Sequence, residues 1–194
     1  MNVLVKDYFI FPTAFSAGYA LHYLNGQLLE HTRDYTHADL YQGIPENTYR
    51  QRFMEQLARN APPGSSIPAY VKTQALYNLI KMMSFAILEE IAFRHILQRR
   101  FLPSLIERIT TRGIIPLAVT LSATTFSLLH LGNKEAQDPS QRKALVIHTL
   151  ILGLIAGMSR EKFSLQAAIA LHLGYNARAW KCTYYNHFPS PEFV

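Results

Sequence analysis

The residues with the clearest chemical potential in this sequence are two adjacent carboxylates, Glu89 and Glu90, within an apolar run. An apolar environment penalises an ionised carboxylate that has no partner. Arg94 follows Glu90 by four residues, with the acid on the N-terminal side, which is the favourable orientation for a helical ion pair. Glu89 is rotated by roughly 100° away from that pair, so its partner must come from elsewhere in the chain. A carboxylate placed in this way is suited to general-base chemistry.

Two further pairs of residues are spaced to share one face of a helix. Phe126 and His130 are four residues apart, as are His172 and Asn176. Together with Glu89 they provide a carboxylate, two imidazoles and an amide, which form a hydrolase site if they converge in a bundle of low dielectric constant. We expect Glu89 to take a proton from water and His130 to orient that water. His172 and Asn176 are expected to donate hydrogen bonds to the developing oxyanion.

These residues fall into three motifs that occur in the same order in a known family. The motifs are Glu89-Glu90-x-x-x-Arg94, Phe126-x-x-x-His130 and His172-x-x-x-Asn176. They resemble the CAAX prenyl endopeptidase and bacteriocin-processing (CPBP, once called Abi) family of intramembrane glutamate proteases, over roughly residues 84–180. The resemblance implies that the first glutamate and His130 activate water and that His172 and Asn176 form the oxyanion hole. It implies a supporting role for the pair formed by Glu90 and Arg94.

A metal site is the alternative interpretation of the same residues. The resemblance implies that zinc can take part in such proteins, with His130, His172 and Glu89 as its ligands. The chain has no H-E-x-x-H helix. We therefore expect catalysis without a cofactor and rank a divalent metal such as zinc second.

Each motif also has a structural interpretation. Glu90 and Arg94 alone would form an ordinary helical ion pair, His130 can cap a helix end, and His172 can bond two helices together. Ionisable residues inside a membrane are costly and are functional by default, so the three motifs together favour a site. His148, in an uncharged run, is expected to be a packed and satisfied imidazole.

The composition indicates a membrane protein more than a nucleic-acid-binding one. The 194 residues suit one domain, with 49% hydrophobic and 16% charged residues and a net charge of +6. The mean hydropathy of +0.01 hides a segregation of charge. Four runs contain no Asp, Glu, Lys or Arg: residues 8–29, 113–133, 144–159 and 163–177. No basic face alternates with stacking aromatic residues, so we expect no nucleic-acid partner and attribute the positive charge to loops that face anionic headgroups.

Some of these runs are long enough to cross a bilayer. Residues 8–25 suffice for a first span, at roughly 20 residues per crossing, and residues 113–133 are the most convincing span. Residues 144–159 contain Gly153 and Gly157, a small-residue stripe that predicts close helix packing.

The charged segments connect these helices. Residues 26–67 are polar and include a predicted amphipathic helix over Asn47–Asn60. Residues 67–102 are helical in pattern throughout but would extend roughly 50 Å as one helix, at 1.5 Å per residue. We therefore expect a break or bend near Met82–Phe85, and a polar connection from Arg99 to Arg112.

The direction of the helices gives an independent check on a shared site. On these boundaries Glu89 is early in its helix, His130 is late in the next and His172 is past the middle of the last. If consecutive helices alternate in direction, the three residues reach the same side of the membrane.

The sequence therefore predicts an all-α, polytopic membrane bundle with a four-helix C-terminal catalytic core. Residues 1–67 are expected to hold a first span, a polar loop and the amphipathic helix, residues 68–180 the protease core, and residues 181–194 an irregular tail. We expect a multi-pass integral protein in the plasma membrane of a prokaryote, with membrane lipid as a partner.

The predicted activity is hydrolysis of a peptide bond in a membrane-associated or lipidated protein or peptide, with Glu89 activating the water. One alternative is a non-catalytic membrane relative that acts in immunity or as a scaffold. The other is a soluble helical protein with a buried polar cluster.

Overall fold

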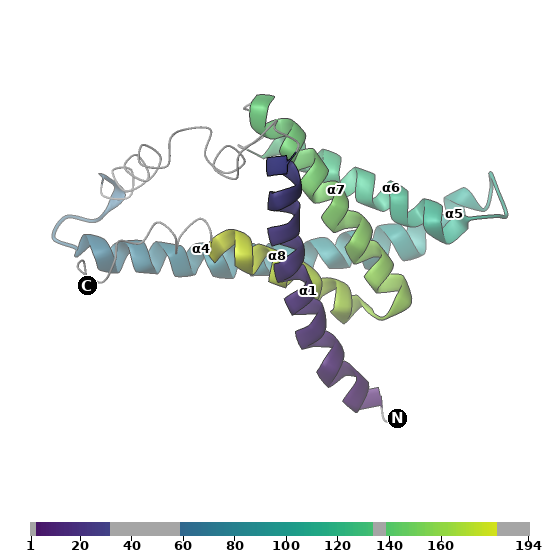
Figure 1. Cartoon of the computed structure of the whole chain (residues 1–194), viewed down its shortest axis with the longest axis horizontal. Coiled ribbons are helices and arrows are strands. Elements are labelled where there is room, and N and C mark those ends of the chain that lie inside the picture. The colour runs from purple at the N-terminus through teal and green to yellow at the C-terminus, as the bar shows by residue number, and fades with distance from the viewer. Residues whose placement is uncertain (1–2, 32–58, 134–138, 182–194) are drawn as a thin grey trace.

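The computed structural model describes residues 3–31, 59–133 and 139–181, and within these residues every regular element is a helix. The elements are α1 (Val3–His31), α4 (Ile67–Glu90), the π-helical segment η1 (Ile91–Phe101), α5 (Leu102–Ile106), α6 (Ile114–Leu129), the 3-10 turn η2 (His130–Gly132), α7 (Pro139–Lys162) and α8 (Leu165–Trp180) (Figure 1). The predicted all-α class is confirmed. The amphipathic helix expected over Asn47–Asn60 lies almost wholly outside the described residues, as does the tail beyond Lys181.

The longest helical stretch runs without interruption through α4, η1 and α5. Of the break or bend expected near Met82–Phe85, the break is wrong, because the sequence from Ala69 to Leu102 contains neither glycine nor proline to interrupt the helix. What changes after Glu90 is the hydrogen bonding, which becomes π-helical and ends with the Leu102 N–H bonded to the carbonyl of Leu97, five residues earlier. Glu89 is consequently near the end of α4 and not early in a separate helix, as the direction argument assumed.

The expected polar connection after Arg99 begins later in the chain than predicted. The π-helical segment continues to Phe101 and α5 then extends to Ile106, with Pro103 in its first turn, where proline is tolerated. The non-helical connection therefore follows Ile106 and leads to Gly113, which caps α6 with φ 68°. Glycine adopts this left-handed conformation without the strain that a Cβ would introduce.

The segment Ile114–Gly132 is, among the described residues, the one helix long and apolar enough to cross a membrane. It coincides with the span predicted over residues 113–133. Only 33% of its most apolar window is buried, whereas the core helix of a soluble protein is mostly buried. Two of its hydroxyls are satisfied within the helix, since those of Thr120 and Thr125 each donate to a carbonyl four residues earlier.

The helices α6 and α7 pack closely where α7 carries its two glycines. A Cβ on Gly153 would lie 3.1 Å from the Cα of Ala123, and one on Gly157 would lie 2.9 Å from Val119 Cγ1. Side chains at these positions would force the helices apart. The predicted small-residue stripe is therefore confirmed.

The helices α1 and α8 cross in contact with each other, and α1 passes across α8 in Figure 1. A Cβ on Gly18 would overlap the carbonyl of Leu171, and one on Gly174 would overlap the carbonyl of Phe15. The Ser164 side chain caps the start of α8 by accepting a hydrogen bond from the Ala167 N–H. The position of α8 between α1 and the rest of the bundle therefore depends on backbone-to-backbone contact.

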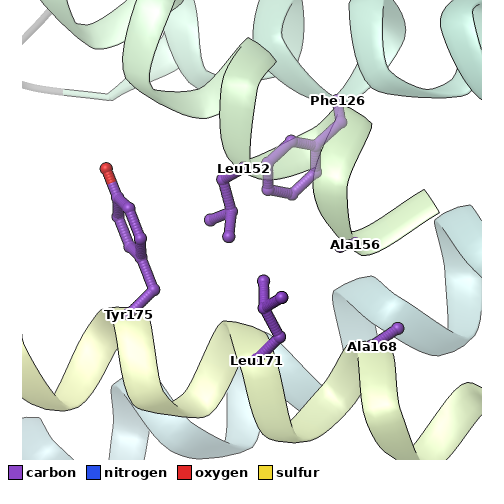
Figure 2. Close-up of a cluster of buried hydrophobic side chains, with 6 residues drawn as sticks. All are labelled: Phe126, Leu152, Ala156, Ala168, Leu171 and Tyr175. Carbon is purple, nitrogen blue, oxygen red and sulfur yellow. The ribbon is translucent and has the colours of Figure 1, made fainter. Parts of the chain in front are cut away.

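A cluster of buried apolar side chains joins α6, α7 and α8 (Figure 2): Phe126, Leu152, Ala156, Ala168, Leu171 and Tyr175. Many large apolar side chains lie instead on the outside of α4, η1 and α6: Leu76, Tyr77, Ile80, Phe85, Leu88, Ile96, Phe101, Leu117, Leu121, Leu128 and Leu129. Exposed apolar surface on this scale indicates contact with lipid or with another protein.

Candidate active site

Glu90 connects two parts of the chain that are far apart in sequence. Its side chain has no exposed surface. Oε2 accepts from Arg94 Nε at 3.1 Å, which confirms the predicted local ion pair. Oε1 lies 3.0 Å from His172 Nδ1, a contact between α4 and α8 that the spacing of residues did not predict. The two partners satisfy both oxygens of a buried carboxylate, as its burial requires.

Arg94 is held in turn by α6. Its Nη1 donates to Ser122 Oγ at 3.0 Å, and that hydroxyl donates to the Phe93 carbonyl at 3.0 Å. The guanidinium also lies 5.4 Å from the centroid of the Phe126 ring. Ser122 was missed in the sequence, where one hydroxyl in an apolar helix carries no signal of its partner.

Glu89 is the accessible carboxylate of the pair, with 30% of its side chain exposed. Its Oε2 lies 3.7 Å from His172 Nε2, so the partner that was expected from elsewhere in the chain is His172. The same imidazole therefore has one ring nitrogen towards each glutamate. At 3.7 Å the contact with Glu89 is longer than a hydrogen bond, and at such a distance a bridging water is the usual link between two polar groups.

His130 approaches this group through an aromatic ring. Its Nδ1 lies 2.8 Å from the Phe126 carbonyl, which can only accept, so Nδ1 carries the proton and Nε2 of the neutral ring has the lone pair. The ring centroids of Phe126 and His130 are 4.4 Å apart, and those of Phe126 and His172 are 5.7 Å apart. Within the described residues His130 has no hydrogen bond or ion pair with Glu89 or His172.

Phe126, a motif residue, thus also packs against several side chains of the site. Its ring, 1% exposed, also packs at 5.2 Å from the ring of Phe93. An aromatic residue one turn before a histidine is the sequence signal that marked it. The ring separates the two imidazoles while it contacts both.

Asn176 stands apart from the contacts above. It lies one turn after His172 on α8 and is half-buried. In the part of the chain that the structure describes, its side chain has no hydrogen bond. The structure therefore brings together Glu89, Glu90, Arg94 and His172 directly, His130 through Phe126, and Asn176 only through its position on α8.

The residues of the alternative metal set are not grouped around a common point. No group of three or more His, Cys, Asp or Glu side chains within residues 3–31, 59–133 and 139–181 is arranged to hold a metal ion. The Nδ1 of His172 is bonded to Glu90, so Nε2 is the ring nitrogen left to coordinate a metal ion. The set formed by His130, His172 and Glu89 does not meet as a metal centre in this arrangement.

Comparison with known proteins agrees with the motifs. The family model described as "Type II CAAX prenyl endopeptidase Rce1-like" matches residues 71–178, which is more than half of the 194 residues and includes all three motifs. No curated protein and no solved structure matches the chain. The chain therefore belongs to the Rce1-like family of type II CAAX prenyl endopeptidases, whose members are membrane proteins.

Proposed function

We propose that this protein is an intramembrane glutamate protease that hydrolyses a peptide bond in a membrane-associated or lipidated protein or peptide. One observation carries the proposal: a partly exposed carboxylate, Glu89, faces an imidazole that a second, buried carboxylate holds in place. A protease of this family acts on a protein or peptide.

Glu89 is the general base of the proposed reaction. It takes one proton from water, and the water oxygen forms a bond to the carbonyl carbon of the scissile peptide. The tetrahedral oxyanion then collapses with cleavage of the C–N bond, and the proton held by Glu89 moves to the leaving amine. His130 orients the attacking water, because its Nε2 lone pair accepts a hydrogen bond once Nδ1 is bonded to the Phe126 carbonyl.

His172 and Asn176 supply the oxyanion hole in this scheme. Both nitrogens of His172 face carboxylate oxygens, which can only accept, so both act as donors when the ring carries two protons. The Nε2–H group can then donate a hydrogen bond to the oxyanion, with the Asn176 amide beside it. Glu90 and Arg94 are the supporting pair: Glu90 fixes the ring by its bond to Nδ1, and Arg94 neutralises the buried charge.

The location that suits this activity is a lipid bilayer. We propose a multi-pass protein in the plasma membrane of a prokaryote, with lipid as a partner and no nucleic acid. The apolar helix Ile114–Gly132 and the exposed apolar side chains of α4 and η1 support the contact with lipid. The protein is expected to stay in the pellet when membranes are washed with alkaline carbonate. Complete release into the supernatant would contradict a membrane-embedded site and favour the soluble alternative.

The decisive experiment is cleavage of a farnesylated peptide ending in C-a-a-X by purified wild type and Glu89→Gln. Loss of the base should lower turnover by about 10²- to 10⁴-fold, the usual contribution of general-base catalysis. Folding should be kept, since Glu89 is partly exposed. Glu107→Gln, at an exposed glutamate after α5, is the matched control. A wild type that cleaves no peptide, with or without the lipid, would instead indicate a non-catalytic relative that acts in immunity or as a scaffold.

A further inference from the structure

The buried face of the long helix has a period of four residues across the site. From residue 86 to residue 106 the buried side chains are those of Ala86, Glu90, Arg94, Gln98, Leu102 and Ile106, and each is at most 8% exposed. In an α-helix a spacing of four advances the side chain by roughly 40°, so five steps would turn this row by roughly 200° to the opposite side.

The π-helical segment removes this drift. Its hydrogen bonds span five residues instead of four, so each turn of η1 contains more residues than an α-helical turn. Within η1, two residues four apart are therefore separated by slightly less than a full turn. This shortfall offsets the angle by which four residues exceed a full turn in α4 and α5. Glu90 therefore faces the bundle in register with Leu102 and Ile106, with Glu89 beside it, only while η1 keeps its wide turns.

A π-helix has poorer hydrogen-bond geometry than an α-helix and persists where contacts with the rest of the fold hold it. At the middle of η1 the contact is made by Gln98, which is 1% exposed. Its Nε2 donates to the Gly157 carbonyl at 3.1 Å and to Glu161 Oε1 at 2.8 Å, both on α7. A reversed amide would turn its oxygen towards these two acceptors, so the orientation is fixed.

The partner helix is shaped for this contact. Gly157 lets α7 approach, since a Cβ there would lie 3.0 Å from Gln98 Oε1 and 2.9 Å from Val119 Cγ1. Glu161 is also bonded to Arg99 Nε at 3.3 Å, so two consecutive residues of η1 are tied to one carboxylate. The same helix turn therefore has one glycine and one acid that both serve η1.

We infer that Gln98 is a positioning residue, which holds η1 in its π-helical register and thereby keeps Glu89 and Glu90 opposite His172. The inference rests on the proposed function for its catalytic consequence, but the register itself is a property of the fold. Gln98 lies two turns from Glu90 along the helix, and its hydrogen bonds go to Gly157 and Glu161, not to Glu89 or Glu90. Its effect on the reaction is therefore transmitted through the helix backbone.

The register is tested by hydrogen–deuterium exchange on the full-length protein in detergent. Gln98→Met keeps the length and apolar volume of the side chain but removes both hydrogen bonds. Amides of Ile91–Phe101 should exchange faster by about tenfold, while those of α6 keep their protection. Gln166→Met, at an exposed glutamine on α8, is the matched control and should leave both segments unchanged. Unchanged exchange in η1 of Gln98→Met would overturn the inference, whatever the activity.

The catalytic consequence is tested with the same farnesylated peptide. Gln98→Met should lower kcat at least tenfold per folded molecule, towards the loss on the order of a hundredfold that follows a misplacement of about 1 Å, with KM nearly unchanged. Glu161→Gln keeps an accepting oxygen and should retain most of the activity, whereas Glu161→Leu should resemble Gln98→Met. A normal kcat per folded molecule, with only a lower melting temperature, would overturn the positioning role.

The two measurements also separate this inference from the proposed function. If wild type cleaves no peptide, the protease proposal fails and the exchange experiment alone decides whether Gln98 holds the register. If wild type cleaves the peptide and Gln98→Met changes neither exchange nor kcat, the protease proposal stands and the inference fails.

Discussion

Two buried polar clusters lie along α8, and they differ in charge and in access. The ionic cluster consists of Glu89, Glu90, Arg94 and His172. The second cluster, called neutral because it contains no Asp, Glu, Lys or Arg, consists of His22, Asn25, His148 and Tyr175, with Tyr175 only three residues after His172. In Figure 2 the side chains of Leu152 and Leu171 lie between Tyr175 and Phe126, so apolar packing separates the two clusters.

The neutral cluster joins three helices and is closed to the outside. His148 Nδ1 lies 2.6 Å from the Tyr175 hydroxyl, and the His22 ring centroid lies 4.7 Å from that of Tyr175. None of the four residues is more than 7% exposed. His148 is therefore a packed imidazole, as predicted, and its Nδ1 is bonded to the Tyr175 hydroxyl.

The comparison shows that buried histidines alone do not distinguish a site from packing. Both clusters contain histidine, but the ionic cluster adds two carboxylates and keeps one of them, Glu89, 30% exposed. A base must reach its substrate, and an oxyanion needs donors with a positive charge nearby. We therefore assign chemistry to the ionic cluster and helix association to the neutral one.

Of the substitutions that test the difference between the two clusters, Glu90→Gln is expected to have the largest effect. It leaves Arg94 as a fully buried charge without its counter-ion, which typically costs about 3 to 5 kcal/mol. We expect a strongly reduced folded yield and melting temperature, measured in detergent. Combining Glu90→Leu with Arg94→Met removes both charges and should restore much of the stability but not the activity. A stable, fully active Glu90→Gln would show that the ionic pair supports neither the fold nor the site.

A smaller effect, confined to turnover, is expected for Asn176→Ala. Losing one oxyanion donor lowers turnover on the order of a hundred- to a thousandfold. Because Asn176 has no side-chain hydrogen bond within the described residues, the melting temperature should stay close to that of wild type. Asn60→Ala, at an exposed asparagine, is the control. Normal turnover with a lowered melting temperature would remove Asn176 from the site and make it a packing residue.

The smallest effect is expected for Tyr175→Phe, at the residue next to Asn176. The substitution removes one hydroxyl from the neutral cluster, a loss of about 1 kcal/mol for a buried hydrogen bond. In a chain of this size that lowers the melting temperature by roughly 2–4 °C, and turnover per folded molecule should not change. Tyr77→Phe, at an exposed tyrosine, should alter neither quantity. A large loss of kcat in Tyr175→Phe would erase the distinction between the two clusters.

The sequence by itself determined the features that depend on local spacing. The ion pair of Glu90 with Arg94, the apolar span over residues 113–133 and the glycine stripe of α7 were all predicted, and the structure contains them. Each follows from helix periodicity or from side-chain size, which neighbouring residues are enough to define. The three motifs likewise identified the family that the family model then matched.

Only the tertiary structure decided which groups meet. The contact of His172 with both glutamates, the bond of Arg94 to Ser122 and the attachment of Gln98 to α7 join residues that are 28 or more positions apart. The π-helical turns after Glu90 were not predicted either, and in the structure they lie against α6 and α7. Long-range packing sets these distances, and spacing along a single chain contains no information about the helix that will lie opposite.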